Sequence, residues 1–142
     1  NYPSRYFISH SAEAAEEITV RLNKTADRNK LGVAEAGRVS YIQISALVNR
    51  ANLSIETLAE AWGVGIIGAR FDRARSCRSR PVGGEPGISC SVYGGVERGG
   101  YRDGVFWKHG PWMFRAEANS QTNIDAVHPD LTALLNGVSW LR

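Results

Sequence analysis

Apolar residues recur at helical spacing in the first part of the chain. Within residues 11–29, the positions that would share one face of a helix are Ala15, Ile18, Leu22 and Ala26. Ser11 can cap the N-terminus of this helix, and Gly32 follows just beyond its end. Glutamates in the first turns and basic residues toward the end match the helix dipole. The pattern therefore predicts a helix over 11–29, after a short strand over 5–9.

Residues 38–51 fit two kinds of element. The residues that suit a strand are Val39, Tyr41, Ile42 and Ile44, and those that suit a helix are Tyr41, Ile44, Leu47, Val48 and Ala51. We favour a helix over 40–51. The next helix has clearer signals, because Ser54 caps it, apolar residues follow helical spacing as far as Trp62, and Gly63 ends it.

The pattern changes over residues 64–118, which are rich in glycine, β-branched and aromatic residues with turn signals at short intervals. This composition is typical of an antiparallel sheet. We expect its strands near 64–73, 88–96, 101–108 and 111–118. The last two should form a hairpin around His109-Gly110, because glycine accepts the positive φ of a tight turn. In that register Trp107 would lie opposite Trp112.

A helix should follow this sheet. Pro129 and Asp130 suit a first turn, and the apolar stripe after them consists of Leu131, Leu134, Leu135 and Val138. Helices, a run of strands and a last helix predict an α+β fold. We expect one domain over 1–142, with a roughly four-stranded antiparallel sheet over about 64–118 packed against the N-terminal helices and the C-terminal helix.

Composition fits a globular chain. Of 142 residues, 43% are hydrophobic and 22% are charged, which excludes a disordered chain, and no apolar stretch is long enough to span a membrane. The net charge is only +3, yet five arginines and one aspartate between Arg70 and Arg80 give that segment a local charge of +4. Such a segment can bind phosphate, nucleic acid or an acidic partner. It can also be a solvated strand edge whose charges prevent aggregation.

The two cysteines flank a loop rich in proline and glycine. Cys77 and Cys90 lie near the arginines and have neither CxxC spacing nor a nearby histidine, so we expect no metal site. A disulfide across this loop would stabilise the fold by about 3 kcal/mol, with two buried thiols as the alternative. We favour the disulfide, which predicts a secreted, periplasmic or cell-envelope location.

Motifs of known enzyme classes are missing from the sequence. Gly63, Gly65 and Gly68 spell GxGxxG, but they follow a predicted helix and open a predicted strand, which is the reverse of the dinucleotide-binding context. The histidines lie far apart in sequence, and His10 and His128 each stand beside an expected helix start, where a solvated or capping role is ordinary. No cofactor is expected.

Two functions are favoured over other enzyme activities that the sequence does not identify. The first is a non-enzymatic binding module that takes an acidic protein or another polyanion, nucleic acid included; its residues would be Arg73, Arg75, Arg78, Arg80, Trp107 and Trp112. Burial of the two tryptophans in the core is the competing interpretation. The second is a small cationic toxin or ribonuclease; its acid–base and phosphate-binding candidates are His109, Glu97, Glu117, Lys108 and Arg115.

Overall fold

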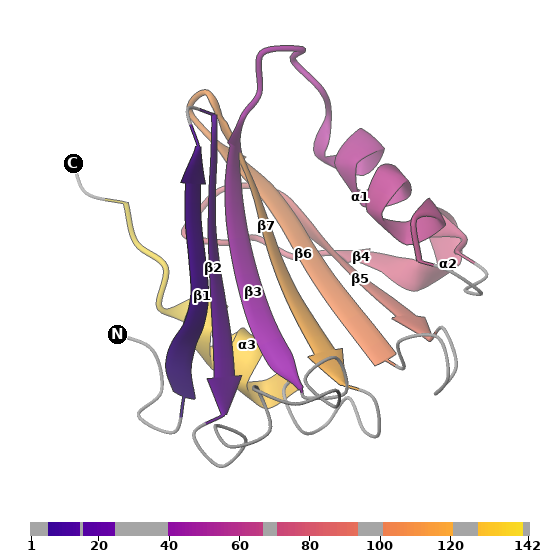
Figure 1. Cartoon of the computed structure of the whole chain (residues 1–142). Helices are drawn as coiled ribbons and strands as arrows, with labels where there is room; N and C mark the ends of the chain where they lie inside the picture. The colour runs from indigo at the N-terminus through magenta and orange to yellow at the C-terminus, as the bar shows by residue number, and fades with distance from the viewer. Residues whose placement is uncertain are drawn as a thin grey trace.

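One antiparallel sheet dominates the fold. The structure, a computed structural model, describes residues 6–14, 16–24, 40–66, 71–93, 101–120 and 128–140. Its seven strands are arranged in the order β1-β2-β3-β7-β6-β5-β4 (Figure 1). They are β1 (Tyr6–Ala14), β2 (Glu17–Lys24), β3 (Tyr41–Val48), β4 (Cys77–Ser79), β5 (Gly87–Tyr93), β6 (Tyr101–His109) and β7 (Trp112–Ser120). The helices are α1 (Ile55–Val64), α2 (Arg73–Ser76) and α3 (His128–Asn136).

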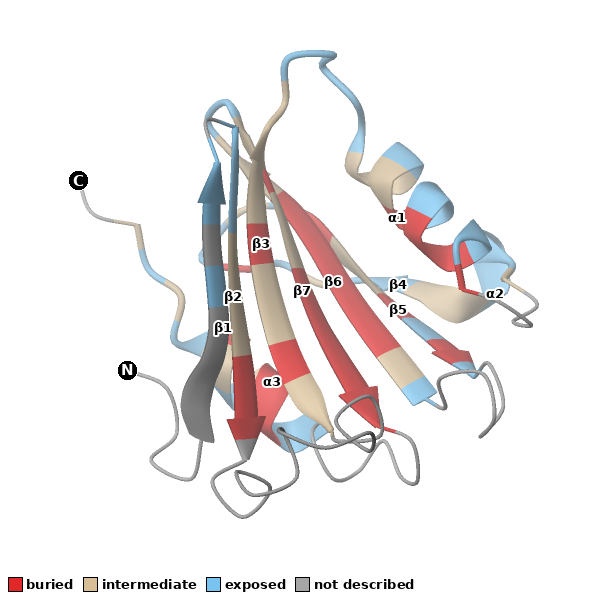
Figure 2. Ribbon diagram, viewed as in Figure 1, coloured by how far each residue is buried: buried red, intermediate tan, exposed pale blue. Residues whose placement is uncertain are grey.

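Helices lie on both sides of this sheet. Successive residues of a strand point to opposite faces, so each strand contributes to two surfaces. Helix α3 packs on one face and α1 on the other, beside β5 and β6 (Figure 1). The buried residues concentrate in the middle strands and on the inner sides of the helices (Figure 2). We call the two surfaces the α3 face and the α1 face.

The larger core lies under α3. Its buried side chains come from β2, β3, β6, β7, the β4–β5 loop and α3, and they are Leu22, Ile42, Val82, Val105, Trp107, Ala116, Ala118, Leu131 and Leu135. Trp107 stacks on Phe114 with ring centroids 5.2 Å apart. Small alanines on β7 leave room for the large residues opposite them, as close packing requires.

A second core lies under α1. Ser54 caps this helix, since its hydroxyl accepts a hydrogen bond from the Thr57 backbone N–H over 3.1 Å. Trp62 meets Phe106 of β6 edge to face, with ring centroids 5.4 Å apart. The other buried members of this cluster are Ala59, Ile66, Cys90 and Val92. Helix α1 therefore covers only the β5–β6 part of its face.

The predicted four-stranded sheet with N-terminal helices is wrong. Residues 11–29 contain the end of β1 and all of β2, and residues 40–51 contain β3, so the strand alternative for that segment is the correct one. In β2, Val20 and Leu22 alternate with Thr19 and Arg21, and the apolar pair faces α3. Leu22 also falls at helical spacing from Ile18 and Ala26, and this pattern favours the wrong assignment.

At both ends of the strand predicted at 64–73 the structure has a helix instead, because α1 extends to Val64 and α2 begins at Arg73, whereas residues 67–70 lie outside the described residues. The three later strands, the helix after Ser54 and the C-terminal helix are present. The hairpin turn lies one residue later than predicted, with Gly110 at φ +57°, so Trp107 pairs with Phe114 and Trp112 pairs with His109. The shift moves the pairing by two residues and therefore leaves every side chain on its predicted face.

The predicted disulfide is confirmed. Cys77 and Cys90 are bonded and face each other across the ladder between β4 and β5, with Cα atoms 4.0 Å apart. This bond attaches the three-residue edge strand β4 to the rest of the sheet.

Candidate functional site

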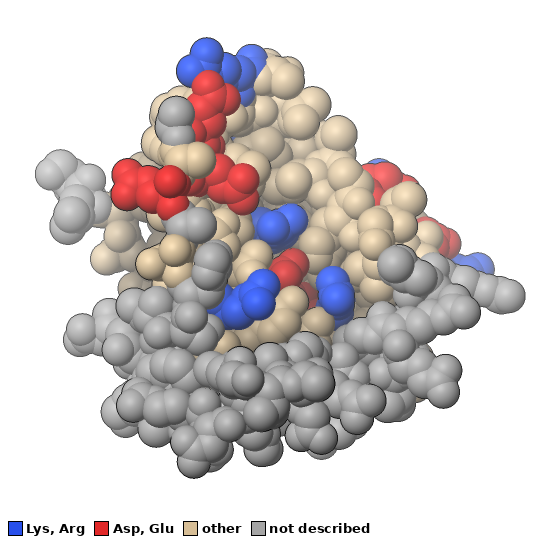
Figure 3. All heavy atoms as spheres, viewed as in Figure 1, with Lys and Arg blue, Asp and Glu red and all other residues tan. Residues whose placement is uncertain are grey.

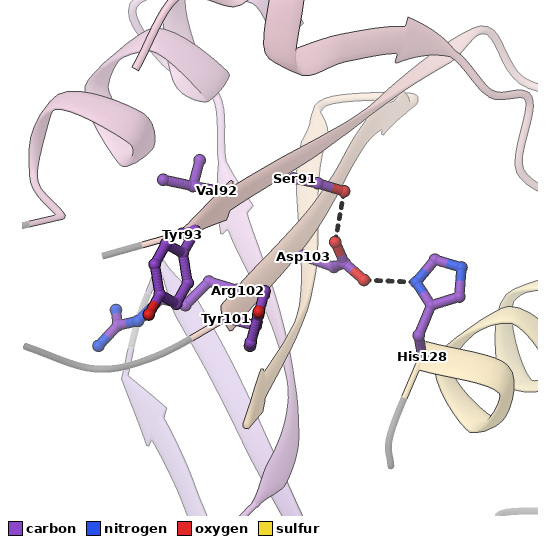
Figure 4. Close-up of a pocket in the computed structure, with 7 residues that line it drawn as sticks. All are labelled: Ser91, Val92, Tyr93, Tyr101, Arg102, Asp103 and His128. Carbon is purple, nitrogen blue, oxygen red and sulfur yellow. Dashed lines mark hydrogen bonds and ion pairs between the residues drawn. The ribbon is translucent and has the colours of Figure 1, made fainter. Parts of the chain in front are cut away.

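A pocket of about 410 Å³ opens where β5 and β6 approach the start of α3. Two cross-strand pairs of the β5–β6 ladder meet there on the α3 face: Ser91 opposite Asp103, and Tyr93 opposite Tyr101. His128, the first residue of α3, also lines it (Figure 4). Val92 and Arg102 complete the lining.

A buried carboxylate holds the histidine of this pocket. The Asp103 side chain is only 3% exposed, whereas that of His128 is 47% exposed. Ser91 Oγ donates a hydrogen bond to Asp103 Oδ1 over 2.5 Å, and Nδ1 of His128 bonds to Asp103 Oδ2 (Figure 4). Both carboxylate oxygens are therefore engaged, as a buried charge requires.

This pair fixes what the imidazole can do. A carboxylate only accepts hydrogen bonds, so Nδ1 of His128 carries a proton and donates a hydrogen bond to Asp103 Oδ2. In the neutral ring Nε2 then has a free lone pair, on the side of the ring away from Asp103 (Figure 4). The arrangement suits acceptance of a hydrogen bond or of a proton from a ligand.

The α1 face carries a second concentration of polar groups. Arg21 of β2, Arg102 of β6 and Arg115 of β7 all point to this face. Basic groups surround an acidic one in a hollow of the molecule seen from this side (Figure 3). We call these three residues the arginine face.

Glu117 of β7 occupies the same face. It is 7% exposed, and its Oε2 accepts a hydrogen bond from Trp62 Nε1 over 3.0 Å. Arg115 Nε lies 3.8 Å from the same oxygen. Arg21 donates two hydrogen bonds to Gln43 Oε1, and its guanidinium lies 4.4 Å from the centroid of the Tyr41 ring. Side chains from α1 and three strands therefore fix this cluster.

The pKa of Tyr41 depends on its burial and on the charged groups of this cluster. Burial raises the pKa of its phenol above the ordinary value of 10.0, and the negative charge of Glu117 raises it further. Arg102, Arg21 and a hydrogen bond to Asn119 act in the opposite direction. Desolvation and the carboxylate together outweigh the two arginines.

We expect Tyr41 to ionise above pH 10 in the folded protein. The unfolded chain ionises first, so this residue contributes stability below pH 10 that is lost as pH rises through the folded pKa. Spectrophotometric titration at alkaline pH should show one late-ionising tyrosine that is missing in Tyr41→Phe. Denaturation at a series of alkaline pH values should show a smaller loss of stability in that variant. Identical titration curves for the two proteins would contradict the assignment.

The four arginines of the sequence prediction do not gather on one surface. Arg73 Nε lies 3.9 Å from Glu60 of α1, and Arg75 Nε lies 3.5 Å from Asp72. Arg78 donates to the backbone carbonyls of Arg75 and Cys77. Arg80 instead donates to Asn136 Oδ1, at the end of α3, over 3.3 Å. These contacts divide the segment between the two sides of the sheet.

The two proposed aromatic anchors also differ. Trp107 is 2% exposed in the core under α3, so its side chain cannot meet a partner at the surface. Trp112 is half-buried at the start of β7. The core interpretation of the aromatic hairpin therefore applies to Trp107.

The ribonuclease candidates that the structure describes do not gather on one face. His109 lies on the α3 face, where its Nδ1 is 2.8 Å from Glu85 Oε1 and its ring stacks on Trp140. Glu117 and Arg115 lie on the opposite face with Lys108. Glu97 lies outside the described residues. A base and an acid on opposite faces of a sheet cannot act on one phosphate.

Sequence reasoning missed the residues that the structure does combine. Asp103 and His128 are 25 positions apart, and the sequence around His128 predicts only a capping or solvated role. The available signal is a lone aspartate on the same strand face as Val105 and Trp107, at a spacing of two residues. Arg21 and Arg102 gave no local signal, because each is isolated in its own segment.

The remaining findings are absences, and they exclude few classes of function. Among the described residues, no helix is long and apolar enough to cross a membrane, and no three histidine, cysteine or acidic side chains gather as metal ligands would. No protein-family model matches the chain, and no curated protein matches it either.

Proposed function

We propose that the protein is a non-enzymatic binding module that holds an acidic partner on the arginine face. The observation that carries this proposal is the convergence of Arg21, Arg102 and Arg115 from three strands onto one face of the sheet. Guanidinium groups suit carboxylates because their planar donors match the two oxygens.

The contacts around Glu117 support this function further. A solvated antiparallel sheet commonly turns one face to water, with mobile charges of both signs. Here Glu117 is buried and bonded to Trp62 Nε1, and Arg102 and Arg115 lie on the same face of the sheet. Glu117 thus helps to position cations on this face. The positive charge of these arginines favours an acidic protein segment as the partner.

The disulfide supports the proposed location. Cysteine pairs persist in oxidising compartments and are rare in the cytosol, so the Cys77–Cys90 bond favours a secreted, periplasmic or cell-envelope protein.

We expect replacement of two face arginines to weaken capture of a polycarboxylate. Labelled poly-L-glutamate is the probe, and fluorescence anisotropy at several salt concentrations is the measurement. The double variant Arg102→Gln, Arg115→Gln should bind at least about tenfold more weakly, with a smaller salt dependence, because two charge-assisted contacts are lost. Circular dichroism should show that the variant retains its sheet.

The matched control removes the same charge elsewhere. Arg75 is 89% exposed and Arg78 is exposed on β4, so Arg75→Gln, Arg78→Gln changes the net charge equally without touching the face. This control should lose less than about threefold in affinity. A larger loss of affinity in the control than in the Arg102, Arg115 variant would place the binding surface at α2 and β4. Equal losses of affinity in the two variants would indicate nonspecific electrostatic attraction. Either result would overturn the proposal.

A further inference from the structure

Tyr41 of β3 lies among the residues of the arginine face, in one row across the sheet with Asn119 and Arg102. Tyr41 pairs with Asn119 of β7, and Asn119 pairs in turn with Arg102 of β6. Because neighbouring strands lie about 4.8 Å apart, the Cα atoms of Tyr41 and Arg102 are about 10 Å apart. Both side chains are long and belong to the same face. One small group of a ligand can therefore contact both of them.

The Tyr41 hydroxyl keeps a proton that it can donate. Its hydrogen bond with Asn119 lowers the pKa of the phenol, so the amide of Asn119 donates and the phenol oxygen accepts. No described residue accepts a hydrogen bond from the hydroxyl itself. Tyr41 is half-buried, and the Arg21 guanidinium lies 4.4 Å from the centroid of its ring. These contacts hold the ring in place and leave one donor on the face.

Two arginines of the same face also carry donors without an acceptor. The Nε atoms of Arg102 and Arg115 are buried and form no hydrogen bond with any described residue. Arg115 Nε lies 3.8 Å from Glu117 Oε2, which is too far for a hydrogen bond. Buried polar groups are nearly always hydrogen-bonded, so these donors favour an acceptor that another molecule supplies.

We propose that Tyr41 is a binding residue of this site, whose hydroxyl donates a hydrogen bond to the same partner carboxylate that Arg102 binds. This inference rests on the proposed function, since it adds a contact to the same site. A carboxylate has two accepting oxygens, so one can accept from the phenol and the other from the guanidinium. Ionisation of Tyr41 removes this donor and places a negative charge beside the carboxylate.

The affinity for labelled poly-L-glutamate tests the contact directly. At neutral pH, Tyr41→Phe should bind about 2- to 12-fold more weakly than the wild type, the contribution of one hydrogen bond. Thr132→Val is the matched control, because it removes one hydroxyl from α3, on the other side of the sheet. The control should bind as the wild type does.

A spectroscopic measurement separates contact with the ligand from a purely structural role. Tyrosine ionisation in the wild type is followed by alkaline absorbance, with and without saturating unlabelled poly-L-glutamate. A bound carboxylate favours the protonated phenol, so the late-ionising tyrosine should titrate at least about 0.3 pH units higher with the ligand, equivalent to a twofold difference in affinity between its two protonation states.

By the same linkage, the affinity of the wild type should fall more steeply than that of Tyr41→Phe as the pH rises above 10. The described charged groups on this side of the sheet come from β2, β6 and β7, and they are Arg21, Arg102, Lys108, Arg115 and Glu117. Tyr41→Phe retains all of them. The difference between the two pH profiles therefore reports the phenol alone.

The outcomes distinguish this inference from the proposed function. Unchanged affinity in Tyr41→Phe, or a tyrosine titration that poly-L-glutamate leaves in place, would overturn the Tyr41 contact and leave the arginine contacts standing. Wild-type affinity in Arg102→Gln, Arg115→Gln would instead overturn the proposed function, and the Tyr41 contact with it. Because the absorbance titration uses the wild-type chain, the inference stays falsifiable even where Tyr41→Phe fails to fold.

Discussion

Replacement of Phe106 by alanine is expected to lower the free energy of unfolding by about 3–5 kcal/mol. The Phe106 side chain is fully buried at the centre of the core under α1 and meets Trp62 edge to face. Its removal leaves a cavity between the helix and β6, because the disulfide at Cys90 and the hydrogen-bonded ladder limit how far the surroundings can collapse. A loss of this size is a large part of the stability of an ordinary domain.

Chemical denaturation followed by circular dichroism measures this loss. Val64→Ala is the control, since Val64 lies on α1 as well but is 71% exposed, and its truncation should change the free energy by less than about 0.5 kcal/mol. Tryptophan fluorescence should report the Phe106 variant separately, because Trp62 loses one of its two ring neighbours and keeps Phe71. A change below about 1 kcal/mol in Phe106→Ala would mean that α1 does not pack on β6 as described.

The elements that the sequence predicted well are those with strong local signals. Ser54 and the apolar spacing that follows it specify α1, and the bond between Cys77 and Cys90 was predicted from their places at the two ends of a loop rich in proline and glycine. The hairpin of β6 and β7 has glycine at the turn, so its strands were predicted and only the pairing was shifted. In each case residues close together in sequence determine the structure.

The first three strands lacked such signals. Val20 of β2 pairs with Ile44 of β3, and Ile44 pairs with Ala116 of β7, so the contacts that select a strand join distant parts of the chain. A short apolar run such as Ile18 to Leu22 fits a helix stripe as well as one face of a strand. Tertiary pairing therefore decided the secondary structure here, against the local pattern.

The candidate sites were hidden for the same reason. The arginine segment attracted notice because its charges are adjacent in sequence, yet its side chains separate in the structure. Arg21, Arg102 and Arg115 come together only because β2, β3, β7 and β6 are neighbours in the sheet. Only the fold brings Asp103 of β6 to His128 of α3.

Loss of the disulfide is expected to lower the free energy of unfolding by about 2–4 kcal/mol. The bond closes a short loop, Cys77 and Cys90 being 13 positions apart, and so restricts the unfolded chain. It also holds β4, an edge strand of three residues whose only described ladder is with β5. In the reduced protein, amide hydrogen exchange should accelerate first at Arg78 and Ser79, before α1 or α3 loosens.

The measurement compares denaturation curves with and without reductant. Cys90 is fully buried, so the reductant is applied during unfolding and refolding, when the bond becomes accessible. The double variant Cys77→Ala, Cys90→Ala is the control, because reductant can change nothing in a chain without thiols. It should match the reduced wild type within about 1 kcal/mol and show the same early exchange in β4. If reductant leaves the wild type unchanged and mass spectrometry finds free thiols, the bond is absent from the native protein, and the argument for an oxidising compartment is lost with it.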